Sequence, residues 1–269
     1  MEFIGYFSAV LIGLILGLIG GGGSILTVPV LVYLFHIHPE LGTAYSLFIV
    51  GSTSLFGVIS KIKQQEVDVQ TALLFGLPSL VAVFMTRKWV LPLIPDQMAV
   101  SENLTVVKST AMMLFFAVLM LFSAARMLRP NREVTIQDPT SNQSFFPLIF
   151  QGFLVGVLTG FVGVGGGFLI VPALVVLRKL PMKKAIGSSL LIIAINSLVG
   201  FTGDIWSQGE KMDWTFLVVI TLLSIAGIII GGQLAKRLET HVLRKGFAWF
   251  VLVMGVFILM KEIFSNFSS

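Results

Sequence analysis

The sequence contains no cysteine, so disulfide bonds, cysteine-ligated metals and thiol-based redox relays are excluded. Charge is also scarce, because only 12% of the 269 residues are charged, about half the share of ordinary soluble domains. Hydrophobic residues make up 56% of the chain, and its mean hydropathy is +0.97. A water-soluble fold of this length could not bury so many apolar side chains, so lipid must solvate many of them. The composition predicts an all-α polytopic membrane protein.

Motifs of several other protein classes are missing as well. The chain lacks H-E-x-x-H, G-x-G-D and any evident Ser–His pairing, which disfavours an intramembrane enzyme, and it lacks the G-x-x-x-x-G-K-[ST] motif of ATP-driven pumps. His36 and His38 have no acidic or histidine partner at a metal-coordinating spacing. The net charge of +5 lies in short gaps between apolar runs, where membrane orientation explains it better than nucleic-acid binding. We expect no catalytic residue, metal, cofactor or nucleic-acid partner.

Two apolar segments are too short to cross a bilayer, which needs about 20 helical residues. Segment 24–35 follows the glycine cluster 20–23, and segment 167–177 follows the cluster 163–167. Adjacent glycines disfavour continuous helix by about 1 kcal/mol each relative to alanine. Both regions are therefore predicted to be broken hairpins of helix, glycine turn and short helix. The other apolar segments are 3–19, 41–60, 69–86, 104–128, 146–162, 184–203, 213–235 and 246–264.

The two broken regions belong to an internal repeat. A shift of 143 residues places GGGGSILTVPVLVYL (20–34) over GVGGGFLIVPALVVL (163–177), and no gap is needed from Gly13/Gly156 to Gly57/Gly200. Matched glycine, proline and serine are more informative than matched leucine in membrane helices. We predict repeat 1 over residues 1–128, a cytoplasmic linker over 129–144 and repeat 2 over 145–269. Identical pairs include Gly17/Gly160, Gly22/Gly165, Gly23/Gly166, Pro29/Pro172, Ser46/Ser189 and Ser54/Ser197.

Charge predicts opposite orientations for the two copies. If each hairpin enters and leaves on one side, four loops share one face and carry thirteen of the eighteen lysines and arginines. The positive-inside rule makes that face cytoplasmic, so both termini lie on the periplasmic side of a bacterial inner membrane. The prediction is two inverted-topology repeats, each a glycine-broken short helical hairpin plus three transmembrane helices. The four loops are 61–68, 126–133, 178–184 and 236–245.

Inverted repeats with paired broken helices indicate a secondary transporter with its site near the membrane midplane. A helix that begins inside the bilayer exposes unpaired N–H groups and the positive end of its dipole, which favours an anion. Glycine lets a ligand approach that backbone, and no carboxylate lies near either cluster. We expect the helix ends at Ser24 and Gly167 to face each other. The candidate residues from the two clusters are Gly22, Gly23, Ser24, Gly165, Gly166 and Gly167.

Polar residues on the next segment of each copy are the other candidates for lining the anion site. Hydroxyl and amide groups beside a helix dipole suit an oxyanion. The alternative is that the serines bond to their own helix backbone. The candidates stand at repeat-related positions: Ser46 with Ser189, Tyr45 with Ser188, and Thr53 with Asn196.

Two ionisable residues and two glycine pairs have competing interpretations. Arg87 is expected to snorkel to the interface, and there it is a candidate for attracting anions to the outer mouth. Asp204 is expected at a solvated helix end and is the candidate carboxylate for proton coupling. The spaced pairs Gly13/Gly17 and Gly156/Gly160 are interpreted as helix-packing points.

The doubled glycine–Val-Pro pattern, G-x-G-G-G-x-x-x-V-P, and Gly187-Ser188-Ser189-Leu190 resemble the sulfite exporter TauE/SafE family over nearly the whole chain. The resemblance implies a transporter of small sulfur-containing anions: sulfite, sulfonates such as sulfoacetate, or related organic acids. The first copy departs from the pattern, because Tyr45 replaces a small hydroxyl residue and could reshape the pocket.

The leading hypothesis is therefore a secondary transporter that moves such an anion by alternating access, with the small anionic substrate and the lipid bilayer as its partners. An anion channel through the same pore and a carrier for a non-sulfur organic acid remain open. A purely structural membrane protein is disfavoured by the polar residues at repeat-related positions. The sequence is compatible with a homo-oligomer, and it leaves the direction of transport and the coupling ion open.

Overall fold

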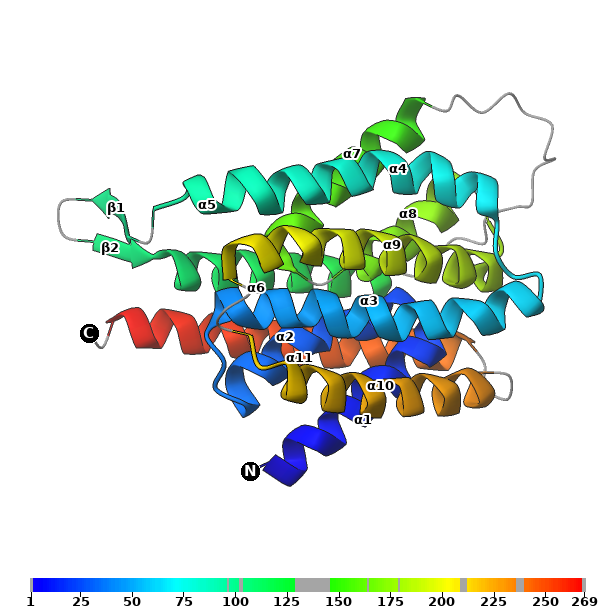
Figure 1. The fold of residues 1–269 in the computed structure, drawn as a ribbon, viewed down its shortest axis with the longest axis horizontal. Coiled ribbons are helices and arrows are strands. Elements are labelled where there is room, and N and C mark those ends of the chain that lie inside the picture. The colour runs from blue at the N-terminus through cyan, green and yellow to red at the C-terminus, as the bar shows by residue number, and fades with distance from the viewer. Residues whose placement is uncertain are drawn as a thin grey trace.

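The computed structural model describes residues 2–95, 97–101, 104–128, 146–163, 165–178, 180–208, 212–235 and 240–267, so the predicted linker 129–144 lies outside the described residues. The described chain is helical apart from one short β-hairpin (Figure 1). Its first half contains α1 (Glu2–Ile19), η1 (Gly21–Leu26), α2 (Thr27–Pro29), η2 (Val30–Leu34), α3 (Pro39–Lys63), α4 (Val69–Met85), η3 (Thr86–Val90), α5 (Leu91–Leu93), β1 (Gln97–Ser101), β2 (Leu104–Val107) and α6 (Lys108–Leu128). Its second half contains α7 (Phe146–Val162), α8 (Gly167–Leu177), α9 (Met182–Gln208), α10 (Trp214–Leu234) and α11 (Thr240–Phe267).

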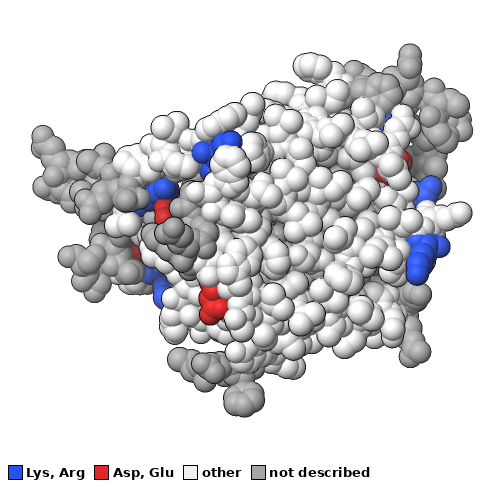
Figure 2. Space-filling view, viewed as in Figure 1, with Lys and Arg blue, Asp and Glu red and all other residues white. Residues whose placement is uncertain are grey.

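Several of these helices have the length and apolar character of membrane spans. Figure 2 shows charged residues toward the two ends of the long axis, with uncharged surface between them. The long helices run along this axis (Figure 1), so the uncharged band matches the hydrocarbon layer of a bilayer. Within the described residues, five helices qualify by length and hydropathy: Pro39–Lys63, Val69–Leu93, Lys108–Ala125, Met182–Trp206 and Trp214–Leu234.

The long helices of the first half pack mainly against helices of the second half. Helix α1 lies along α10, and α7, which occupies the repeat position of α1, lies along α4. Helix α3 packs against its repeat counterpart α9, and α6 packs against its counterpart α11. The counterparts run in opposite directions, as α3 and α9 do along the long axis in Figure 1. The two halves are therefore intertwined.

Glycines allow the close helix crossings. A Cβ on Gly13 of α1 would collide with the carbonyl oxygen of Ser224 on α10, and a Cβ on Gly156 of α7 would collide with that of Ser79 on α4. Gly17 meets α10 one turn further along, and Gly160 meets Val83 near the end of α4 and Thr86 at the start of η3. The predicted packing role of these repeat-related glycines is confirmed.

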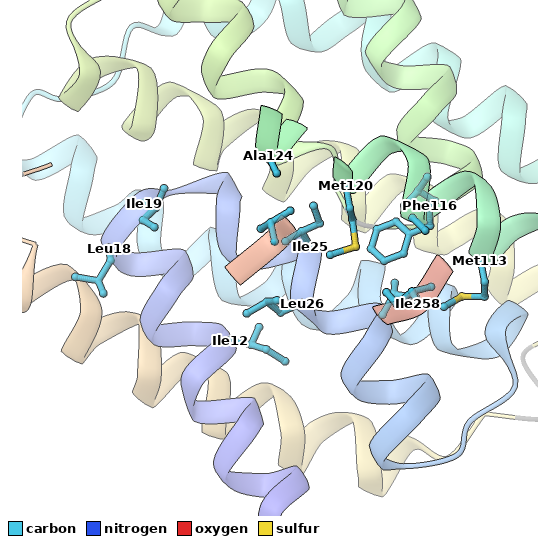
Figure 3. Close-up of a cluster of buried hydrophobic side chains, with 14 residues drawn as sticks. Ile12, Leu18, Ile19, Ile25, Leu26, Met113, Phe116, Met120, Ala124 and Ile258 are labelled. Atoms are coloured by element: carbon cyan, nitrogen blue, oxygen red, sulfur yellow. The ribbon is translucent and has the colours of Figure 1, made fainter. Parts of the chain in front are cut away.

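A large apolar cluster fills the space between the first broken segment and the α6–α11 pair. Figure 3 shows Ile25 and Leu26 of η1 near Met120 and Phe116 of α6. Ile258 of α11 closes the same cluster. Burial of these side chains holds the first broken segment in place by the hydrophobic effect and close packing.

Two predicted boundaries in the first half are wrong. Segment 104–128 begins with β2, which pairs antiparallel with β1, so the helix itself begins at Lys108. The first short helix begins at Gly21, earlier than Ser24, and runs as 3-10, α and π turns to Leu34. Pro29 lacks an N–H group for the helical ladder, which accounts for irregular turns around it. The second short helix, α8, spans the predicted residues 167–177.

Candidate functional site

The two glycine breaks meet each other in the middle of the bundle. A Cβ on Gly21, the first residue of η1, would collide with the Cα, C and O atoms of Gly167, the first residue of α8. The sequence predicted that Ser24 and Gly167 would face each other. The contact is made by Gly21 because η1 begins three residues before Ser24. Only glycine at both positions lets the two backbones approach this closely.

The polar side chains at the first break bond to nearby carbonyl groups of the chain. Ser24 Oγ donates to the Gly21 carbonyl at 2.7 Å, and Ser189 Oγ, which lies beside Gly20, donates to the Ile186 carbonyl at 2.8 Å. Gly22 lies within η1, and Gly23 packs against the backbone of α1. These hydroxyl donors are therefore already used inside the protein.

The second break depends on three glycines in the left-handed region of backbone space. Gly163, Gly165 and Gly166 have φ values of 70°, 69° and 70°, and Gly166 is the N-cap residue of α8. A residue with a Cβ is strained in this conformation. The turn lets α8 start inside the bundle, with the N–H groups of its first turn and the positive end of its dipole beside Gly166.

Each of these three glycines lies against a buried polar side chain. A Cβ on Gly163 would collide with Nη2 of Arg87. A Cβ on Gly165 would lie 2.6 Å from Oγ of Ser197. A Cβ on Gly166 would collide with Oγ1 of Thr159. Among the described residues, none of these three polar atoms has a hydrogen-bond partner. Because a buried polar atom without a partner is costly, this arrangement is suited to a polar ligand.

Arg87 is the most deeply buried charge at this break. Its side chain is 1% exposed, and its Nη1 atom lies 3.1 Å from Oδ2 of Asp204 and 3.2 Å from Oγ1 of Thr43. The predicted snorkelling of Arg87 to the interface is therefore wrong, and Asp204 is buried rather than solvated. No pattern in the sequence indicated this pairing, since the partners are 117 residues apart and the repeat counterpart of Arg87 is Ile230.

Tyr45 and Ser188, which are repeat counterparts, both hold the start of a helix. The backbone N–H of Asp213 donates to the Tyr45 hydroxyl at 2.6 Å, and that of Asp68 donates to Ser188 Oγ at 2.8 Å. Each aspartate then caps its helix, α10 or α4, through its carboxylate. These contacts give Tyr45 and Ser188 an anchoring role beside the predicted lining role.

The remaining predicted residues lie on the packed faces of α3 and α9. Ser46 and Thr53 are fully buried, and their hydroxyls have no partner among the described residues. Asn196 Nδ2 donates to Ser79 Oγ at 2.6 Å, while its Oδ1 atom has no partner among the described residues. Ser54 and Ser197 were missed as site residues, although their identity across the repeat was a signal. Both are fully buried, and neither hydroxyl has a partner among the described residues.

The acidic and histidine side chains do not form a metal site in the part of the chain that the structure describes. No group of three or more of them is close enough together to hold an ion. The arrangement at the second break, with helix N–H groups, a guanidinium and two hydroxyls, is suited to an anion.

Comparison with known proteins gives one family. The family described as "Sulfite exporter TauE/SafE" matches residues 6–258. A "Probable membrane transporter protein" of Xylella fastidiosa is 28% identical, covering 94% of this chain and 92% of its own length. The "Probable membrane transporter protein YunE" of Bacillus subtilis is 26% identical, and the match covers 95% of this chain and 98% of that protein. The "Probable membrane transporter protein MJ0441" of Methanocaldococcus jannaschii is 24% identical, and the match covers 93% of this chain and 94% of that protein. No solved structure matches the chain.

Proposed function

The chain belongs to the sulfite exporter TauE/SafE family and is a membrane transporter, not an enzyme; from this premise we propose that it carries a small sulfur-containing anion, sulfite or an organosulfonate such as sulfoacetate, by alternating access. The observation that most directly supports this proposal is the geometry of the second glycine break. Gly163, Gly165 and Gly166, which lie just before α8, each stand beside a buried polar atom that has no hydrogen-bond partner among the described residues. Sulfite and sulfonates present several oxygen atoms on one sulfur, which suits convergent N–H and O–H donors.

We further propose that the two halves are inverted-topology repeats, residues 1–128 and 145–269. Three observations support this: the matched glycines and serines, the opposite directions of α3 and α9 in Figure 1, and the exchange of packing partners between halves. Because the halves are intertwined, the units that move would be bundles built from helices of both halves, and these can rock about the contact of Gly21 with Gly167. Such rocking would expose the second break alternately to the two sides.

The proposed setting is a bacterial inner membrane with both termini on the periplasmic side. Loops rich in lysine and arginine, such as 61–68 and 178–184, would then lie in the cytoplasm. Arg87 and Asp204 would lie toward the periplasmic end of the bundle. The hydroxyls of Ser46, Thr53 and Ser197 are the further candidates for contact with the anion along its path.

Counterflow in liposomes tests this function. Purified protein is reconstituted with unlabelled sulfite inside, and uptake of labelled sulfite is measured in competition with sulfoacetate, thiosulfate, taurine and simple carboxylates. We expect counterflow that sulfite and sulfonates inhibit. Inhibition by carboxylates alone would indicate that the substrate is a non-sulfur organic acid. Sustained currents without counterflow would indicate that the protein is a channel.

The matched variants for this assay are Ser197→Ala with Thr159→Ala and the control Thr202→Ala. The first pair removes two hydroxyls at the break, while Thr202 is exposed and bonds to the carbonyl of Val199 on its own helix. Counterflow should fall about tenfold or more in the double variant and stay unchanged in the control. Equal transport in both would remove the second break from the substrate path.

A further inference from the structure

Arg87 lies inside a candidate membrane span, where an ionisable residue is costly to bury and commonly marks a substrate or ion pathway. It belongs to η3, the continuation of α4, and the span that contains it runs from Val69 to Leu93. Its neighbour Lys88 is only partly buried and lies over the ring of Trp206 at 4.6 Å. The two adjacent cations therefore have different surroundings, because only Arg87 turns into the bundle.

The guanidinium of Arg87 is only partly satisfied by the protein. Nη1 contacts both carboxylate oxygens of Asp204 and the hydroxyl of Thr43. Nε and Nη2 are buried and have no hydrogen-bond partner among the described residues. Together these two nitrogens form the edge of a guanidinium that binds an oxyanion through two parallel hydrogen bonds. The ion pair with Asp204 leaves that edge unused.

The unused edge faces the second glycine break. Nη2 occupies the space that a Cβ on Gly163 would take, at the end of α7 and four residues before α8 begins. The oxygen atoms of Thr159 and Ser197 approach the same break at Gly166 and Gly165. A guanidinium edge, two hydroxyls and the positive end of the α8 dipole therefore approach one short segment of backbone.

We propose that Arg87 binds the transported anion directly, through Nε and Nη2, while Nη1 stays paired with Asp204. This inference rests on the proposed function and names the main charged contact of that site. The ligand class is a small oxyanion with at least two oxygens on one atom, as in sulfite or a sulfonate. Asp204 keeps the guanidinium neutralised when the site is empty, and it competes with the anion for the same positive charge.

Anion binding to the purified wild type and four variants tests the proposal. The variants are Arg87→Gln/Asp204→Asn, Arg87→Lys, the charge-swapped Arg87→Asp/Asp204→Arg and the control Lys88→Gln. The double variant removes both charges together, so no buried ion is left alone. Thermal unfolding without anion reports folding, and the shift of the unfolding temperature with increasing sulfite or sulfoacetate gives the affinity.

We expect anion affinity to be about ten- to hundredfold weaker in the double variant and unchanged in Lys88→Gln. Arg87→Lys should be weakened as well, because an ammonium keeps the charge and loses the two-donor edge. The charge-swapped Arg87→Asp/Asp204→Arg keeps an ion pair and moves the cation to α9. It should fold and bind the anion no better than the double variant.

Wild-type affinity in a folded double variant would overturn the role of Arg87 and leave the proposed function standing. Wild-type affinity in the charge-swapped protein would also overturn it, because the position of the guanidinium would then be irrelevant. If the unfolding temperature of the wild type did not shift with any sulfur oxyanion, the result would contradict the proposed function itself.

Discussion

The hydroxyls of Tyr45 and Ser188 accept hydrogen bonds from the backbone N–H groups of Asp213 and Asp68, across the interface between the two halves. The two positions are repeat counterparts, yet one carries a phenol and the other a small hydroxyl. Tyr45 also packs its ring against Phe216, with centroids 5.9 Å apart. The departure from the family pattern at Tyr45 is therefore explained by packing and by the start of α10.

Replacing Tyr45 with phenylalanine should lower stability more than it alters transport. The variant keeps the ring and removes the acceptor of the Asp213 N–H group, so we expect a loss of about 1 kcal/mol in the free energy of unfolding. Thermal unfolding in detergent measures this loss, with Tyr6→Phe as the matched control, whose ring packs edge-on against Phe35. Unchanged stability combined with altered anion selectivity would instead make Tyr45 a pocket residue.

Residue types and repeat symmetry predicted the glycine break well and the charged pair poorly. Gly165, Gly166 and Gly167 are predicted because their cluster is denser in glycine than helix packing requires. Arg87 and Asp204 were assigned to interfaces because each stands near the end of an apolar run. Their burial depends on how η3 packs against α9, and periodicity along one segment carries no information about such long-range pairing.

At the scale of elements, the crossings of α1 with α10 and of α7 with α4 are both set by glycine. Gly156→Ala should destabilise the α7–α4 crossing, because the new Cβ would collide with the Ser79 carbonyl. We expect a loss of about 1–3 kcal/mol in unfolding free energy. Gly232→Ala is the control, since a Cβ there meets nothing within 4 Å. Equal unfolding temperatures for the two variants would contradict a packing role for Gly156.

Element boundaries were predictable where one signal dominated. The start of α8 follows from glycines that break the helix on one side and an apolar run on the other, and its predicted bounds are confirmed. The run Leu104–Val107 pairs as a strand instead of extending the helix, and a short apolar run does not distinguish the two. The first short helix starts earlier than predicted because glycine tolerates the 3-10 turn at Gly21.

At the scale of the whole molecule, inverted repeats predict that equivalent positions are labelled from opposite sides of the membrane. The chain has no cysteine, so a single introduced cysteine gives no background. Gln64, just after α3, and Trp206, near the end of α9, are both exposed. In vesicles of one orientation, an impermeant maleimide should label Trp206→Cys from the periplasmic side and Gln64→Cys from the cytoplasmic side. Labelling of both from one side would show that the repeats are parallel.

The sequence predicts a duplication, whereas it does not predict the exchange of packing partners between the halves. Matched glycines predict two copies, but each copy could in principle have folded on its own. The structure instead pairs α1 with α10 and α7 with α4. The reason is steric: the glycine surface of α1 fits the backbone of α10, including Gly227 and Gly231, which meet Val10 and Leu14.

This exchange constrains how the protein is made. During synthesis α1 has to enter the membrane long before α10 emerges from the ribosome, and Arg87 precedes Asp204 by 117 residues. A nascent first half therefore carries the Arg87 guanidinium before Asp204 on α9 is made, and the glycine surface of α1 before α10 is made.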